Sequence, residues 1–290
     1  MSKAVVPEYY TISLQILSSS IDVIIFPLAI LTFIYLNINI YFWDKPFQED
    51  FQKLMVIITN GFAIFPAIVA DGFFLKFMIL GTMITSFWAH IDWEHFSVPG
   101  FEDEPGKWDN AFSAGVIIAY CCSFFPDRWF TKCFKSNNRK PRDLDYITKP
   151  WHTNSCSCPL NTKTLCQVLA TSISFIIILI HYNDNSPIFT IGEVGFKIGD
   201  ILCIGFAVFA LIVGVLYVCN TQDHLNNKSK FETFIILGIG LVIYAVIIKK
   251  AGENSELPEA VHAVWHVCIF TGAYCISRAH SYIKLYRNFI

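Results

Sequence analysis

Charge is scarce in this chain of 290 residues: only 15% of the residues are charged, and the net charge is −2. The absence of a basic surplus argues against a nucleic-acid partner, because binding to phosphate backbones needs clustered Lys and Arg. The chain shows neither an internal repeat nor a low-complexity linker. Its ten cysteines do not form a disulfide scaffold, since most of them lie in apolar stretches where Cys serves as a small core residue.

Apolar residues dominate instead, at 54% of the chain with 27 Phe, which argues against a soluble domain. They form eight runs near the roughly 20 residues that a membrane-spanning helix needs. The runs cover residues 16–42, 54–70, 73–91, 109–125, 164–182, 199–219, 231–248 and 259–277. This pattern predicts an all-α, polytopic membrane protein with a seven-transmembrane-helix core over 54–277. An N-terminal segment, 1–53, holds an extra transmembrane helix, which we expect to be retained because it is too long for a signal-peptide core.

Lysine and arginine predict the orientation, because they accumulate in cytoplasmic loops. If the eight runs alternate across the membrane, most of these residues fall on one side: Lys3, eight residues of the long 126–163 loop, Lys228, Lys230 and those of a short 278–290 tail. That side is expected to be the cytosol. The expected localisation is the plasma membrane, with the endoplasmic reticulum or Golgi as the alternative.

Two polar steps stand out within the apolar runs: Ser86-x-x-x-His90 and His262-x-x-x-His266. Residues four apart share one face of a helix, and polar groups at membrane depth tend to face a functional interior. The third run ends with the first step, the fourth begins at Asp109, and the eighth opens with the second step. By the predicted alternation, all five groups lie at the extracytoplasmic end.

Each of these groups also has an ordinary structural explanation. A single intramembrane histidine is more often a packing residue than a ligand, but three at one depth favour a metal site. Ser86 alone would donate to the carbonyl one turn earlier. Asp109 could cap the fourth helix as well as serve a site.

Three neutral imidazoles are good Zn²⁺ ligands, and a site with three protein ligands leaves a position for water, whose pKa the metal lowers to about 7. The carboxylate of Asp109 could orient that water or accept its proton, and the hydroxyl of Ser86 could hold it or stabilise an oxyanion. We expect the substrate of such a site in a bilayer to be a lipid amide or ester.

These residues resemble the CREST superfamily of seven-helix membrane hydrolases. The resemblance rests on three stretches: GTMITSFWAH (81–90), DNAFS (109–113) and VHAVWH (261–266). The Thr-Met before the serine and the His-x-x-Trp-His pattern are most similar to the branch that contains myomaker and the transmembrane protein 8 group. Alkaline ceramidases and the progestin and adiponectin receptors are more distant. The resemblance covers residues 54–277.

The resemblance implies zinc ligands at His90, His262 and His266, with Ser86 and Asp109 as the polar partners of the metal-bound water. The chain departs from the family in two places. An acidic residue that usually follows the first histidine by three is replaced by Asp92 and Glu94, and the stretch from His90 to Asp109 is longer than usual.

Two classes of function stay open. One is a zinc-dependent lipid hydrolase, either a ceramidase-like amidase or a phospholipase-like esterase. The other is a non-enzymatic fusion factor, remodelling factor or lipid-sensing receptor with a structural zinc. A bis-histidine haem site fits less well, because the histidines number three.

Two further motifs lie outside this site. His152, Cys156, Cys158 and Cys166 could form a cytosolic metal cluster, but their spacing matches no standard zinc module, so a palmitoylated or merely reduced loop fits better. Asn227-Lys228-Ser229 has the glycosylation pattern, yet the predicted topology places it in the cytosol, where it would stay unmodified.

Overall fold

The structure is a computed structural model, and it describes residues 8–42, 49–70, 72–91, 104–123, 162–181, 188–191, 194–205, 208–209, 228–252 and 258–287. The 126–161 part of the predicted basic loop lies outside these ranges, and with it His152, Cys156 and Cys158. Asp92, Glu94 and Asn227 also lie outside them.

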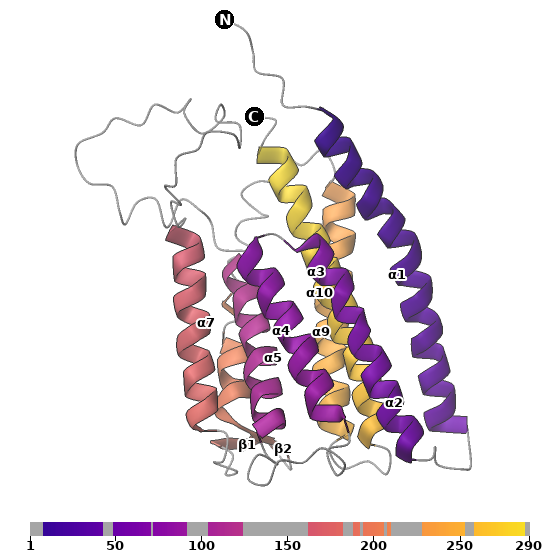
Figure 1. Ribbon diagram of the computed structural model, residues 1–290, viewed down its shortest axis with the longest axis vertical. Coiled ribbons are helices and arrows are strands. Elements are labelled where there is room, and N and C mark those ends of the chain that lie inside the picture. Colours follow the sequence, from indigo (N-terminus) through magenta and orange to yellow (C-terminus); the bar gives the residue numbers. More distant parts are fainter. Residues whose placement is uncertain are drawn as a thin grey trace, which may run out of the picture.

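Helices make up the described chain apart from one short hairpin, which confirms the all-α prediction. They are α1 (Glu8–Phe42), α2 (Glu49–Asn60), the 3₁₀ turn η1 (Gly61–Ala63), α3 (Ile64–Val69), α4 (Phe73–His90), α5 (Glu104–Ser123), α7 (Thr162–Ile180), α9 (Lys228–Gly252) and α10 (Pro258–Arg287). Residues 198–205 are helical as well. The strands β1 (Phe189–Ile191) and β2 (Val194–Phe196) pair antiparallel at one end of the helical bundle, as Figure 1 shows.

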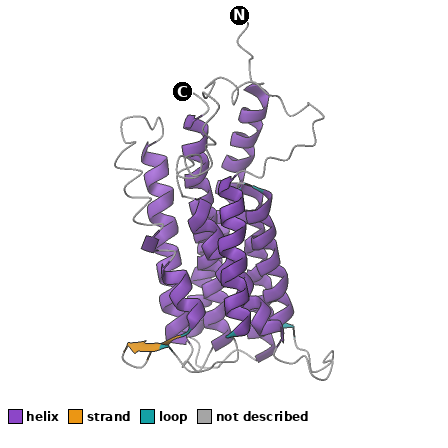
Figure 2. Ribbon diagram, turned by 90° about the vertical axis from the view of Figure 1, so that its left-hand side faces the viewer, coloured by secondary structure: helices purple, strands orange, loops and turns teal. Residues whose placement is uncertain are grey.

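The helix axes are roughly aligned with one another in both views (Figures 1 and 2), and the colours of Figure 1 show that successive helices alternate in direction. Four stretches are long and apolar enough to cross a membrane: Ser20–Ile38, Phe73–His90, Ser229–Lys249 and Glu259–Tyr282. Lys53–Val69 and Thr164–Ile180 are apolar but shorter. These helices indicate a membrane protein, while the number of seven core spans stays a prediction.

The central helix of the bundle is α10. Of its apolar stretch, 83% is buried, against 17% in α9, 22% in α1 and 33% in α4. It packs against α9, α2, α3 and α1. The other three helices therefore turn most of their apolar surface outward, as helices facing lipid do, whereas α10 is enclosed by protein.

The fourth and fifth helices interlock through glycine. A side chain at Gly81 of α4 would collide with the ring of Phe112 on α5, and a Cβ at Gly115 of α5 would lie 2.6 Å from Cε of Met78 on α4. Each helix thus receives one large side chain of the other over a glycine, which sets their separation and register. In the same way α9 and α10 cross closely at Gly238 and Gly272.

A partly buried ion pair joins the N-terminal helix to the central one. The guanidinium of Arg278 on α10 donates to both carboxylate oxygens of Asp22 on α1, from Nη2 at 2.8 Å and from Nε at 3.1 Å. The hydroxyl of Tyr274 donates to the same carboxylate. Since an intramembrane charge needs such partners, α1 is anchored to the bundle through this pair.

The structure shows element boundaries that hydropathy did not resolve. The second predicted run, 54–70, is divided into α2, η1 and α3. Pro66 lacks an N–H and its ring crowds the carbonyl one turn earlier, so a regular α-helix does not continue through the turn before it. At the other end of the chain, α10 continues ten residues past 277, so most of the predicted tail is helical.

Candidate metal centre

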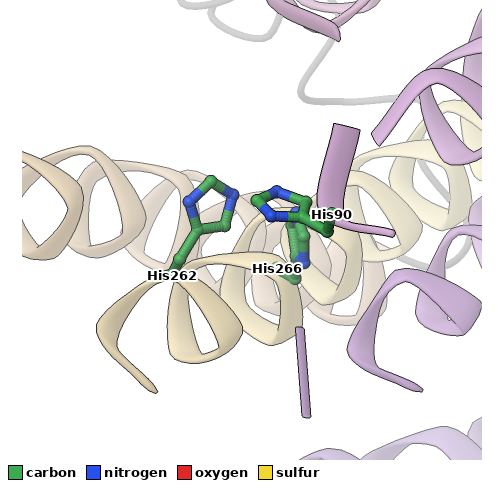
Figure 3. Close-up of side chains that lie close together, drawn as sticks. All are labelled: His90, His262 and His266. Carbon is green, nitrogen blue, oxygen red and sulfur yellow. The ribbon is translucent and has the colours of Figure 1, made fainter. Parts of the chain in front are cut away.

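Three histidines from two helices meet at the end of the bundle where α4 finishes and α10 begins. His90 is the last residue of α4, and His262 and His266 follow one another by one turn on α10 (Figure 3). One ring nitrogen of each lies within 4.8 Å of the others. The ring centroids are 4.6 Å apart for His90 and His262, and 4.7 Å apart for His262 and His266. The predicted convergence of the two helical steps is therefore present.

The Nε2 atoms of these rings are the ones left available for a ligand. Nε2 of His90 and of His262 is buried and has no hydrogen-bond partner among the described residues. Nε2 of His266 lies 3.2 Å from the hydroxyl of Ser86. Buried polar atoms without partners are costly. A shared cation would satisfy Nε2 of His90 and of His262, and it would take the place of the Ser86 hydroxyl at Nε2 of His266. The donor set is made only of imidazoles, which suits Zn²⁺ and other borderline metals.

The opposite nitrogen of His266 is held by α2. Its Nδ1 lies 3.4 Å from the hydroxyl of Thr59, and the ring also hydrogen-bonds the backbone of Val56. The Thr59 hydroxyl has its own acceptor, the carbonyl of Met55 at 2.8 Å, so it accepts from Nδ1. A proton on Nδ1 leaves the lone pair on Nε2, the tautomer that a metal ligand needs.

Sequence reasoning did not identify Thr59. A threonine inside an apolar helical run ordinarily donates to the backbone one turn earlier, as Thr59 does. Its second contact, to His266, depends on how α2 is rotated against α10. No signal in the sequence reports that rotation.

Ser86 and Asp109 both reach this cluster. Ser86 is 1% exposed, and its hydroxyl lies between Nε2 of His266 and the carboxylate of Asp109, with which it also interacts. The neighbouring hydroxyls of Thr82 and Thr85 donate to carbonyls one turn earlier in α4. Ser86 faces the histidines instead, so the site interpretation of this residue accounts for its contacts better than back-bonding does.

The capping interpretation of Asp109 is wrong. The fifth helix begins at Glu104 rather than at Asp109, so Asp109 lies in its second turn. Its side chain is 8% exposed, and Oδ1 is buried without a hydrogen-bond partner in the described part of the chain. The carboxylate is therefore placed inside the bundle, beside the Ser86 hydroxyl, and not at a helix terminus.

Lys249 of α9 contributes a positive charge to the surroundings. Its ammonium lies 4.3 Å from the ring centroid of Trp265, the residue before His266. It is close enough to interact electrostatically with all three histidines and with Asp109. A cation here favours negative charge at the site, whether on Asp109 or on a reacting group.

The second proposed cysteine and histidine cluster falls largely outside the described residues. Of its members only Cys166, on α7, is described, and it is a free, half-buried thiol.

No protein-family model, curated protein or solved structure matches this chain, so the assignment of a function rests on the sequence motifs and on the geometry of the three-histidine site.

Proposed function

We propose that this protein is a zinc-dependent membrane hydrolase, related to the CREST superfamily, that cleaves an amide or acyl ester bond of a membrane lipid. In this proposal the core has seven spans and the site faces the extracytoplasmic side. The observation that carries it is the pairing of Ser86 with Asp109 beside three histidines that already suffice as ligands. A purely structural zinc is usually closed by a fourth protein ligand rather than bordered by a hydroxyl and a carboxylate.

Each residue has a defined part in this chemistry. His90, His262 and His266 would hold the metal, which when bound acts as a Lewis acid and lowers the pKa of water. Asp109 is the candidate base, because its buried Oδ1 is available to accept a proton. The single hydroxyl proton of Ser86 is donated to the Asp109 carboxylate while that carboxylate is charged, and it becomes available to an oxyanion on an attacked carbonyl once Asp109 has taken up a proton. The charge of Lys249 favours the same developing anion.

The position of the site along the helices supports a lipid substrate. His90 ends a helix that is just long enough to span a membrane. The ends of such helices lie where the hydrocarbon core meets the headgroup region. That boundary is where the amide and ester bonds of membrane lipids are found, so a polar lipid bond can reach the histidines without crossing the apolar interior.

The test combines zinc content with turnover. Purified wild-type protein is expected to hold about one zinc per chain, and His266→Ala to lose it, because the ligand set falls to two. Ser86→Ala and Asp109→Asn should keep zinc but lose at least 100-fold in turnover of the best substrate in a panel of lipid amides and esters, since they act on the proton and the oxyanion.

Thr85→Ala is the matched control. It removes a hydroxyl next to Ser86 that only donates within its own helix, so zinc and turnover should both persist. If wild-type protein binds zinc but hydrolyses nothing in the panel, and Ser86→Ala and Asp109→Asn keep full biological activity, the metal is structural. The fusion or receptor function would then replace the hydrolase.

A further inference from the structure

Glu259 of α10 contacts the one metal-site histidine that does not share its helix. Its Oε2 lies 3.7 Å from Nδ1 of His90. We infer that Glu259 is a positioning residue, which sets the orientation and tautomer of His90 so that Nε2 faces the metal. The inference rests on the proposed metal site and goes beyond it, because neither the predicted motifs nor the family resemblance includes this carboxylate.

The helical spacing places Glu259 where this contact is possible. Glu259, His262 and His266 follow one another by three and four residues, so all three lie along one face of α10. The side chain of Glu259 is 34% exposed as a whole, yet Oε2 is buried. The carboxylate thus has one oxygen turned into the bundle, toward the ring of His90, whose own side chain is only 14% exposed.

The orientation of His90 depends on a contact from another helix more than the orientation of His266 does. It is the final residue of α4, and the next residue, Ile91, is already extended, with φ −71° and ψ 132°. His266, by contrast, lies inside α10 and is held at Nδ1 by α2. At 3.7 Å the two atoms are too far apart for a hydrogen bond. A small rotation of either side chain brings the carboxylate close enough to accept from Nδ1 of His90, which fixes the ring and leaves the lone pair on Nε2, the pattern found around many protein metal sites.

Two other roles for Glu259 explain the position of its Oε2 atom less well. A direct metal ligand would have to lie on the Nε2 side of His90, whereas Oε2 lies on the Nδ1 side. An acidic residue in the first turn also stabilises a helix N-terminus. That effect needs only a negative charge near the end of α10, and it does not require a buried oxygen beside an imidazole.

Substitutions of Glu259 separate the effect of its negative charge from the effect of its side-chain length. Zinc affinity is measured by chelator competition on the full chain in detergent for wild type, Glu259→Ala, Glu259→Asp and Glu259→Gln. We expect about 10-fold to 100-fold weaker binding in Glu259→Ala, the usual loss when such a partner is removed. Glu259→Asp should lose a similar amount because it is one methylene too short. Glu259→Gln keeps the length and an acceptor oxygen, so it should lose only a few-fold.

Thermal unfolding of the metal-free protein reports the helix role independently. Glu259→Ala and Glu259→Gln should unfold at a lower temperature, because both remove the charge from the first turn of α10, while Glu259→Asp should match wild type. The opposite orders of Asp and Gln in the two measurements distinguish positioning from helix stabilisation. They also decide the matter if Glu259→Ala fails to fold.

A double-mutant comparison shows whether the effect passes through His90. In a His90→Cys background, which keeps a metal ligand at this position but lacks the Nδ1 that faces Glu259, Glu259→Ala should change zinc affinity no further. An equal loss in both backgrounds, or wild-type zinc affinity in Glu259→Asp, overturns the inference. Absence of stoichiometric zinc from wild type overturns the metal site and this inference together. The expected zinc pattern without any lipid hydrolysis leaves the inference standing and removes only the hydrolase.

Discussion

Two of the three histidines of the candidate site are contacted by groups of different kinds. A carboxylate contacts His90, while a hydroxyl and a backbone group from α2 hold His266. In both rings the contact is made at Nδ1, so Nε2 remains for the metal. Groups from two helices, α10 and α2, therefore orient imidazoles that are carried by α4 and α10.

Among the described residues, Asn60 has a buried side-chain amide whose surroundings are apolar in effect, because both of its polar atoms are unpaired. It is 1% exposed, and neither its amide nitrogen nor its amide oxygen has a hydrogen-bond partner in the part of the chain that the structure describes. Unpaired buried amides cost about 1–3 kcal/mol. Asn60→Leu, which keeps a similar volume, should therefore raise the free energy of unfolding by about 1 kcal/mol. Denaturant unfolding in detergent, followed by tryptophan fluorescence, measures this change.

The neighbouring Thr59→Val provides the control, since the Thr59 hydroxyl does have an acceptor, the carbonyl of Met55. The same loss of a polar group should there lower stability or leave it unchanged, and weaken zinc binding through His266. A clear loss of stability in Asn60→Leu would show that the amide is satisfied after all, for example by a buried water.

The sequence predicted the site residues that form helical steps and missed those that approach from other helices. Ser86, His90, His262 and His266 were recognisable because a spacing of four within an apolar run has a direct geometric meaning. Thr59 and Lys249 were not, because their part depends on the rotation of α2 and α9 against α10. Apolar surfaces face lipid on one side and protein on the other, so hydropathy does not report that rotation.

At the scale of elements, the reciprocal fit of α4 and α5 keeps the site together. Gly81 precedes Ser86 on α4, and Phe112 lies one turn after Asp109 on α5. Because the ring of Phe112 occupies the space over Gly81, the distance between these helices also sets how Asp109 approaches Ser86.

Gly81→Ala should consequently lower stability by about 1–3 kcal/mol, the usual effect of overpacking. Phe112→Leu in the same chain should recover part of the loss, because a smaller side chain makes room for the new methyl group. Thermal unfolding of the single and double variants in detergent measures both effects.

Gly61→Ala is the matched control for this change, since nothing lies within 4 Å of a Cβ built there. It should be neutral or slightly stabilising, because alanine restricts the unfolded chain more than glycine does. Equal losses at Gly81 and Gly61 would mean that backbone freedom, and not the fit with Phe112, explains the glycine.

The sequence predicted which helices form better than it predicted the residues at which they begin and end. Runs of apolar residues located α4, α9 and α10, because length and hydropathy suffice for a spanning helix, and they located the shorter α7 as well. The start of α5 was misplaced, since residues 104–108 include Glu104, Lys107 and a glycine and lack the apolar pattern. The division of the second run could have been read from Pro66, which disfavours a continuous helix.

At the scale of the whole molecule, the positive charge of the 126–163 loop makes a prediction about sidedness. An epitope inserted near Asn137 should be reached by antibody once only the plasma membrane is opened with digitonin, because basic loops stay in the cytosol. An epitope near Asn254, between α9 and α10, serves as the opposite control and should stay hidden until internal membranes are dissolved or be reachable on intact cells.

If the Asn137 epitope were instead exposed on intact cells and the Asn254 epitope cytosolic, the orientation would be reversed. The candidate site lies at the Asn254 end of α9 and α10 and would then face the cytosol. The histidine cluster itself would be unaffected, since its assembly depends on the relative direction of the helices and not on the membrane leaflet.

The ion pair between α1 and α10 also has a consequence for biosynthesis. Asp22 and Arg278 are separated by 256 residues, so a ribosome adding about 5–20 residues per second makes the arginine tens of seconds after the aspartate. During that interval the Asp22 carboxylate has entered a span without its counter-ion, a state that costs about 2.5–3.5 kcal/mol at the centre of a helix and less near its end. The first helix is thus not anchored by this ion pair until α10 has been made. A chain truncated before Arg278 therefore carries the Asp22 carboxylate without its counter-ion.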